Sequence, residues 1–181
     1  VEELKKLLTQ MGLETTSVWL SGCSTEDLQR VAEAETLLAL PYGRAAAQIL
    51  GERTGARVVD VDLPVGFEAT VSWVEFLAAE LGLSTAALAA MEAAAADAYR
   101  RAAKAVMRHL VDRPFAICTE SLLGARIAAM VLEMGGDVQL LATAGERLSP
   151  ADTKLADVVL ENSTMEQVSA ALRYVADDAL G

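Results

Sequence analysis

The chain has 181 residues and a formal net charge of −11, and 53% of its residues are hydrophobic although only 4% are aromatic. This length allows one large or two small cores, and the acidic charge disfavours nucleic acid as a partner because phosphate backbones are also negative. No stretch approaches the roughly 18 uninterrupted apolar residues of a membrane span and no secretory leader is recognisable, so we expect no membrane contact and a cytoplasmic location.

The first part of the chain predicts two helices and a strand. Residues 2–11 carry leucine and methionine at helical spacing and predict a helix that Gly12 ends. Residues 17–20 predict a strand. Residues 24–34 predict the second helix, because they begin with Ser-Thr and two acids, which cap free amides and complement the helix dipole.

A strand, a helix and a second strand follow in residues 37–61. The apolar run 37–40 predicts the first strand, a Pro-Tyr-Gly turn leads into the helix, and the β-branched run 57–61 predicts the second strand. Gly55 is expected to end the helix with a positive φ, since glycine adopts left-handed backbone at little steric cost.

The same unit recurs further along the chain. Residues 115–119 predict a strand, residues 122–134 a helix and residues 138–143 the closing strand. Gly55 and Gly135 are 80 positions apart, so each helix end keeps its place relative to the strand that follows. Repeated βα units of this kind predict parallel sheets that are covered by helices.

The remaining elements connect the two units or follow the second one. They are expected as helices at 70–81, 86–111 and 163–176, a loop at 144–156 and a strand at 157–160. The predicted fold class is α/β, with Rossmann-like parallel sheets, flanking helices and two tandem units joined by a long helix. We expect residues 1–83 to form a unit that lacks its first strand, and residues 84–181 to form the long bracing helix and the second unit, as a fragment of a longer chain.

The middle of the chain resembles a known family. The series Leu50 to Gly55, then Leu63 to Gly66, Thr70 and Phe76–Leu77 resembles the Leu-Glu-Glu, Gly, Pro-Ile-Gly, Thr, Phe-Leu pattern of nitrogenase component 1-like proteins. That family includes the nitrogenase subunits, the scaffold on which their cofactor is assembled, and the light-independent protochlorophyllide reductases. The resemblance implies that the parent subunit has three Rossmann-like domains, of which this chain is similar to the second and third.

The resemblance also implies cofactors and partners. The cluster-ligating cysteines of the family lie mostly in the first domain, so an iron–sulphur or related metallocofactor is expected in the full-length protein, and no cofactor or metal in this chain. A further cysteine of the cofactor-bearing nitrogenase subunit corresponds to residues 40–42, and a Gly-Gly and an Arg correspond to residues 120–123. This sequence has none of these. The implied partners are a homologous component 1-like subunit and an ATP-dependent iron–sulphur reductase.

The candidate cofactor-binding residues are those that follow the first strand of each predicted unit. Open α/β sheets bind ligands at the carboxyl ends of their strands, and the resembled family uses these two turns. Arg44 and Arg126 are the cations best placed to hold an anionic cofactor, and the alternative is that both pair with surface acids. The full set is Pro41, Tyr42, Gly43, Arg44, Glu120, Ser121, Gly124 and Arg126. No residue is assigned a catalytic role.

Structural roles compete with these functional ones. Neither turn has a GxGxxG motif, so we expect the two glycines, Gly43 and Gly124, to serve close packing of helix on strand. Glu120 and Ser121 are expected to cap a helix. Asp60 and Asp62 share a strand face and are expected to form an exposed charged edge.

A structural role is also expected for the cysteines and the aromatic residues. Cys23 and Cys118 have no CxxC spacing and are expected to be reduced, with Cys118 buried. The aromatics Trp19, Trp73 and Phe76 are expected to anchor a core or a subunit interface.

Three functions remain open from the sequence. In the first, the chain is a fragment of a nitrogenase component 1-like oxidoreductase subunit without its cluster-ligating domain, and is by itself inactive. Alternatively it is a non-catalytic module that binds or assembles a metallocofactor or tetrapyrrole, or a generic α/β domain that binds a small molecule.

Overall fold

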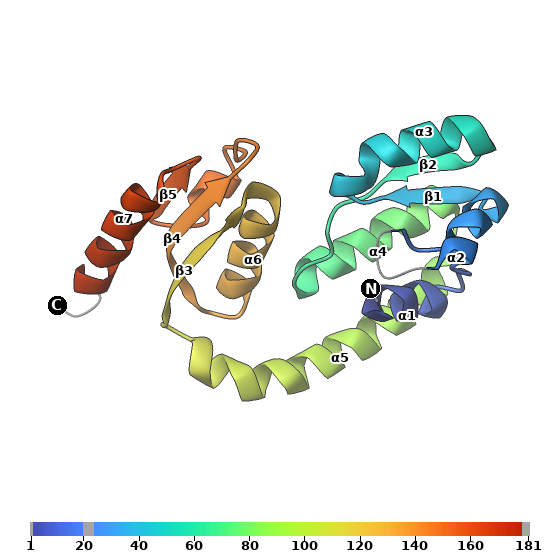
Figure 1. The fold of residues 1–181 in the computed structure, drawn as a ribbon. Coiled ribbons are helices and arrows are strands. Elements are labelled where there is room, and N and C mark those ends of the chain that lie inside the picture. The colour runs from blue at the N-terminus through green and yellow to red at the C-terminus, as the bar shows by residue number, and fades with distance from the viewer. Residues whose placement is uncertain (1, 20–23, 179–181) are drawn as a thin grey trace. The chain divides into compact units, whose positions relative to one another are not determined.

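The computed structural model describes residues 2–19 and 24–178. The chain divides into two compact units (Figure 1). Unit 1 consists of Val1–Leu63 and Trp73–Ala93, and unit 2 of Pro64–Ser72 and Ala94–Gly181. No helix in the described ranges is long and apolar enough to cross a membrane.

Unit 1 is built on a two-stranded parallel sheet. The strands pair from Thr36 opposite Arg57 to Ala39 opposite Asp60. Gly51 lets the connecting helix approach the sheet, since a Cβ there would lie 2.5 Å from Cγ2 of Val58. The elements of this unit are α1 Glu2–Gln10, α2 Thr25–Gln29, a 3-10 turn Arg30–Glu33, β1 Thr36–Ala39, a 3-10 turn Pro41–Gly43, α3 Arg44–Thr54 and β2 Arg57–Asp60, with parts of α4 Phe67–Leu81 and α5 Thr85–Leu110.

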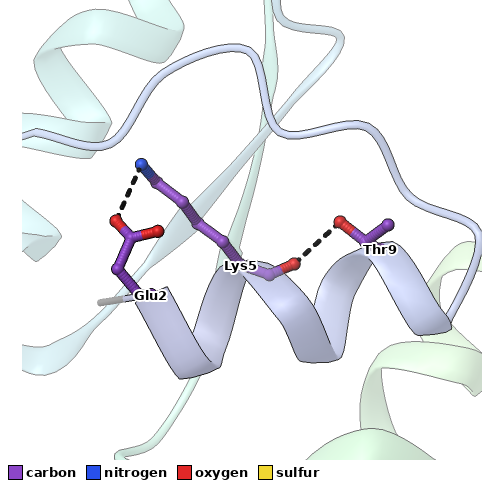
Figure 2. A network of polar contacts seen from close by, with 3 residues as sticks. All are labelled: Glu2, Lys5 and Thr9. Atoms are coloured by element: carbon purple, nitrogen blue, oxygen red, sulfur yellow. Dashed lines mark hydrogen bonds and ion pairs between the residues drawn. The ribbon is translucent and has the colours of Figure 1, made fainter.

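The solvent face of α1 is held by contacts between successive turns (Figure 2). Lys5 Nζ lies 3.4 Å from Glu2 Oε1, and the Thr9 hydroxyl donates to the Lys5 carbonyl oxygen over 2.9 Å. An ion pair at this spacing stabilises a helix by only about 0.2–0.5 kcal/mol, and a hydroxyl that bonds back to the carbonyl four residues earlier adds no stability. The helix is therefore fixed mainly by its opposite face, where Leu8 is buried.

The core of unit 1 contains one of the three aromatic anchors that we expected. Trp73 is 4% exposed and packs with the other core residues Leu8, Met11, Val59, Val61, Val74, Leu77, Ala78 and Leu88. Trp19 and Phe76 are 38% and 43% exposed, so a core role is wrong for both, and the alternative of a subunit interface stays a prediction. On α4 the inward face passes through Trp73 and Leu77, four residues apart, and Phe76 falls outside it.

The strand expected at residues 17–20 is wrong for the residues that the structure describes. Ser17 to Trp19 form no strand, and Leu20 lies outside the described residues. Among described residues β1 pairs with β2 alone. Strand propensity in this hydroxyl-rich stretch is not sufficient, because a strand forms only where a neighbour completes its ladder.

Unit 2 is built on a three-stranded parallel sheet in the order β3-β4-β5. Figure 1 shows α6 on one face of this sheet and α7 on the other. The core against α6 contains Ile117, Ala128, Val131, Val138 and Leu141. The elements are β3 Pro114–Glu120, α6 Ser121–Glu133, β4 Asp137–Ala144, a 3-10 turn Asp152–Lys154, β5 Val158–Glu161 and α7 Met165–Asp178, together with the rest of α4 and α5.

The sequence signals for helix ends are largely confirmed. Gly55 and Gly135 have φ values of 77° and 80°, and each stands between a helix and the strand that follows it. At the start of α7, the Thr164 hydroxyl accepts from the Gln167 amide over 3.3 Å and the Gln167 side chain accepts from the Thr164 amide over 2.8 Å. Together with the parallel sheets and flanking helices, these features confirm the predicted α/β fold class.

Candidate functional site

The turn after β1 opens α3 without a side-chain cap. Pro41–Gly43 form one 3-10 turn, and Gly43, the residue before α3, has no side chain with which to cap the helix amides. Tyr42 is 66% exposed. A Cβ on Gly43 would meet nothing within 4 Å, so close packing does not explain this glycine, and that expectation is wrong. The turn therefore presents an exposed aromatic side chain and an uncrowded backbone.

Arg44 pairs with the two acids of the neighbouring strand end. Its Nε lies 3.8 Å from Oδ1 of Asp60 and its Nη2 lies 3.9 Å from Oδ1 of Asp62. Asp60 and Asp62 are exposed, as expected for a charged edge. All three side chains are about half exposed, and ion pairs of this kind contribute roughly 0–1 kcal/mol. The alternative of pairing with surface acids is thus confirmed for Arg44, and the pairing is weak.

The turn after β3 is capped by its own carboxylate. Glu120 precedes α6 in extended conformation, and its side chain accepts from the backbone amides of Leu122 and Leu123, the first over 3.0 Å. Ser121 is 5% exposed, and its hydroxyl donates to the carbonyl oxygen of Glu146 and lies 3.2 Å from that of Ala144. The expected capping role is confirmed for Glu120, and Ser121 binds the turn to the loop after β4. An anion that uses these amides has to displace Glu120.

Gly124 packs closely against the sheet. A Cβ at this position would lie 3.2 Å from Cγ2 of Thr143 and 3.3 Å from side-chain atoms of Leu141 and Thr119. The close-packing interpretation is therefore confirmed here. Arg126, two residues further along α6, is half-buried. Of the eight candidate residues, the structure brings Pro41 to Arg44 together in unit 1 and Glu120 to Arg126 together in unit 2.

Cys118 is exposed, so the expectation of a buried thiol is wrong. Its neighbour Ile117 points to the α6 side of the sheet and is buried. Residues alternate between faces along a strand, so Cys118 points to the opposite face, which is open at this edge of the sheet. Cys23 lies outside the described residues.

A site that the sequence did not predict surrounds the start of α4. Gly66 has a φ of 90°, and a Cβ there would lie 2.8 Å from Oε2 of Glu133 on α6. Both carboxylate oxygens of Glu133 accept from the Phe67 amide, over 3.2 and 3.1 Å. The Thr70 hydroxyl donates to the Gly66 carbonyl oxygen over 2.6 Å. The Pro-Val-Gly motif thus ends in a helix start that a distant carboxylate caps.

The aromatic ring of Tyr99 on α5 completes this arrangement. It stacks on the Phe67 ring with 4.6 Å between centroids and 18° between planes. Burial, and after it the hydrogen bond to the Glu133 carboxylate, raise the pKa of Tyr99 to about 12. We call Gly66, Phe67, Thr70, Tyr99 and Glu133 the α4 anchor. Sequence spacing gives no signal for it, because Phe67 and Glu133 are 66 positions apart.

The raised pKa of Tyr99 predicts a loss of stability in alkali. A tyrosine whose pKa is higher in the folded chain stabilises it fully below the unfolded pKa of about 10, and this contribution falls as the pH rises to about 12. Thermal unfolding from pH 9 to 12 should show a melting temperature that falls for the native chain. The fall should be smaller for Tyr99→Phe. Parallel curves for the two proteins would contradict the contact with Glu133.

Metal-ligating side chains do not gather in the part of the chain that the structure describes. In the described part of the chain, no group of three or more His, Cys, Asp or Glu side chains is arranged to hold a metal ion. The whole sequence contains two cysteines and one histidine. Iron–sulphur clusters ordinarily take four cysteine or histidine ligands.

Parallel sheets with flanking helices and strand-end turns define a Rossmann-like α/β protein. A family model for nitrogenase component 1 type oxidoreductases matches residues 1–178, and the chain belongs to this family. The resemblance in the middle of the sequence predicted this family, and the match confirms it.

Individual relatives agree with the family match. A light-independent protochlorophyllide reductase subunit of Methylobacterium sp. is 31% identical over 137 residues, which cover 73% of this chain and 26% of that protein. The corresponding reductase subunit of Gloeobacter violaceus is 36% identical over 75 residues, covering 40% of this chain and 14% of the relative. The chain therefore spans about a quarter or less of the curated relatives that it matches.

A solved structure supports the fold. The chain is similar to a structure titled "Nitrogenase Cp1 at pH 6.5", with a TM-score of 0.64 and 16% identity, over 92% of this chain and 42% of the other. At this identity the similarity establishes the fold alone.

Proposed function

We propose that the chain is a piece of a nitrogenase component 1-like oxidoreductase subunit that supplies strand-end turns for a cofactor or substrate and leaves metal-cluster ligation to another domain. The family match over residues 1–178 carries this proposal. The scarcity of cysteine and histidine supports the absence of a complete cluster site in this chain.

The proposed ligand is a carboxylate-bearing tetrapyrrole. The names of the two protochlorophyllide reductase relatives support this class of ligand. Within the chain, the turn after β1 is the better binding site. Arg44 is 48% exposed and its ion pairs are long, so a ligand carboxylate can exchange for an aspartate at small cost. The turn after β3 contributes less, because Glu120 already occupies its amides.

The proposed partners are a homologous component 1-like subunit and an ATP-dependent iron–sulphur reductase. Membership of the family supports both. In this arrangement the chain itself holds and orients the ligand, another domain of the subunit ligates the cluster, and the reductase supplies the electrons.

Titration with protochlorophyllide tests the ligand and the turn together. The native chain should bind it saturably, as followed by absorbance and fluorescence. Arg44→Gln should weaken binding at least about tenfold, since a hydrogen bond to a charged group contributes roughly 1.5–3 kcal/mol. Arg53→Gln is the matched control, because Arg53 is exposed on the last turn of the same helix. Equal affinities for the native chain and Arg44→Gln, or backbone NMR shifts confined to residues 144–156, would contradict the site.

A non-catalytic binding or assembly module is the second candidate function. The lack of a metal-binding group among the described residues fits this module as well as it fits the oxidoreductase piece, since neither ligates a cluster through this part of the chain. The sequence of the full-length protein separates the two. Three or more cysteines in a preceding domain favour the oxidoreductase, and their absence favours the module.

A further inference from the structure

The loop after β4 is held at its start by a side chain that follows β5. Oδ1 of Asn162 accepts from the Gly145 amide over 2.9 Å, and its Nδ2 donates to the Gly145 carbonyl oxygen over 3.2 Å. The backbone amide of Asn162 donates to the Thr143 carbonyl oxygen over 2.7 Å, as the next step of the parallel ladder requires. The side-chain oxygen then takes the place that a backbone carbonyl would have in that ladder.

Asparagine suits this position in two ways. Asn162 has a φ of 51°, and asparagine enters this left-handed region more readily than most residues with a side chain. Its amide also offers one acceptor and one donor group, which the two contacts with Gly145 need, whereas a carboxylate only accepts. Asn162 is the one asparagine among the 181 residues.

Two further side chains hold the same loop. Oε1 of Glu161 accepts from the Leu148 amide over 2.7 Å, and the Ser121 hydroxyl donates to the Glu146 carbonyl oxygen. Residues 145–148 are therefore fixed at three points, from the end of β5 and from the first residue of α6. The loop opens only when these hydrogen bonds break.

We propose that Asn162 is a deamidation site whose reaction is controlled by the opening of this loop. In deamidation the backbone nitrogen of the next residue, Ser163, forms a bond to Cγ of Asn162, the bond from Cγ to Nδ2 breaks, and ammonia leaves. Water then opens the cyclic imide to aspartate or isoaspartate. In the closed loop both polar atoms of the amide are bound to Gly145, so the side chain has to leave Gly145 before Cγ can approach the Ser163 nitrogen.

The reaction would loosen the loop permanently. An aspartate at position 162 still accepts from the Gly145 amide, but it has no donor, so the Gly145 carbonyl oxygen faces a carboxylate oxygen instead of an N–H group. Isoaspartate also adds a carbon to the backbone. The loop contacts the turn after β3 through Ser121, so the change reaches the carboxyl edge of the sheet in unit 2. This inference is independent of the proposed function, because it needs no ligand.

Deamidation kinetics test the protection. The native chain and the urea-unfolded chain are incubated in the same mildly alkaline buffer at the same temperature, and the product at position 162 is measured by peptide mass spectrometry. The native chain should react at least about tenfold more slowly, because two hydrogen bonds have to break first. Equal rates for the two states would overturn the proposal, and so would an unfolded chain that does not react.

Glu161→Ala tests the control by the loop. It removes the acceptor of the Leu148 amide, so the loop should open more often. Relative to the same variant in urea, deamidation should accelerate by the same factor as hydrogen exchange of the Gly145 amide, because both occur in the open loop. Glu161→Gln keeps an oxygen acceptor and is the matched control, with both rates close to those of the native chain. Faster exchange at Gly145 without faster deamidation in Glu161→Ala would overturn the proposal.

Asn162→Asp reproduces one product and tests its effect. The Gly145 and Leu148 amides should exchange at least about tenfold faster than in the native chain, while the amides in the centre of β4 keep their protection. Unchanged exchange at Gly145 and Leu148 would overturn the claim that deamidation loosens this loop.

Discussion

Replacing Glu133 with alanine is expected to lower the free energy of unfolding of unit 2 by about 3 kcal/mol, since it removes a helix cap and leaves a half-buried hydroxyl without its partner. The Phe67 amide loses both acceptor oxygens, and Tyr99 loses its hydrogen bond. Glu133→Gln keeps an oxygen acceptor and should cost less than half as much. Urea unfolding, followed by hydrogen exchange of the amides in residues 64–72 and 94–178, measures the loss for this unit.

The control for this prediction is Glu166→Ala in the first turn of α7. Glu166 is exposed, and its replacement should change stability by no more than about 0.5 kcal/mol. Similar losses for Glu133→Ala and Glu166→Ala would show that the α4 anchor contributes nothing beyond an ordinary surface carboxylate.

Gly66→Ala should destabilise unit 2 by about 2–4 kcal/mol, because it combines backbone strain with a steric clash. The φ of Gly66 is 90°, and the added Cβ would lie 2.8 Å from the Glu133 carboxylate and 3.3 Å from Cβ of Met130. A shift of Glu133 away from this Cβ disturbs its hydrogen bonds to the Phe67 amide. Thermal unfolding measures the total loss of stability. Hydrogen exchange of the first turn of α4 measures how much of that loss falls on the start of the helix.

Gly145, in the same unit, offers a control for the backbone term. Its φ is 108°, and the nearest atom to a Cβ there would be Oγ of Ser121 at 3.9 Å, an ordinary contact, so Gly145→Ala carries strain without a clash. The loss for Gly66→Ala should exceed that for Gly145→Ala by at least about 1 kcal/mol, the usual minimum cost of overpacking. Equal losses would mean that contact with Glu133 and Met130 has no energetic effect.

Local sequence signals predicted most of the elements, because they act over a few residues. The glycines at 55 and 135 mark helix ends through their backbone freedom, and the apolar run in residues 115–119 marks a strand. Helix and strand periodicity is a pattern of nearby residues, so it can be seen in the sequence of a single element. The family followed from a motif of the same local kind.

The errors arise where a distant neighbour decides the outcome. Residues 17–19 have the composition of a strand but form none in the structure. Cys118 ends an apolar run, yet it is exposed because the sheet is open on that side of β3. Burial and pairing depend on what packs against an element, and the sequence of the element alone does not contain that information.

The candidate site also divides into features that local sequence predicts and features that depend on distant neighbours. The capping role of Glu120 follows from its position before a helix, which the sequence displays. The pairing of Arg44 with Asp60 and Asp62 requires β1 and β2 to lie side by side. Glu133 was missed because nothing near it in the sequence marks it as the cap of α4.

Anaerobic reconstitution of the chain with iron and sulphide, followed by iron analysis and absorption spectroscopy, tests most directly whether this scaffold leaves cluster ligation to another domain. The account predicts a colourless protein without stoichiometric iron, since two cysteines and one histidine do not complete the usual four-ligand site. A stoichiometric cluster that disappears in Cys23→Ser or Cys118→Ser would contradict the account.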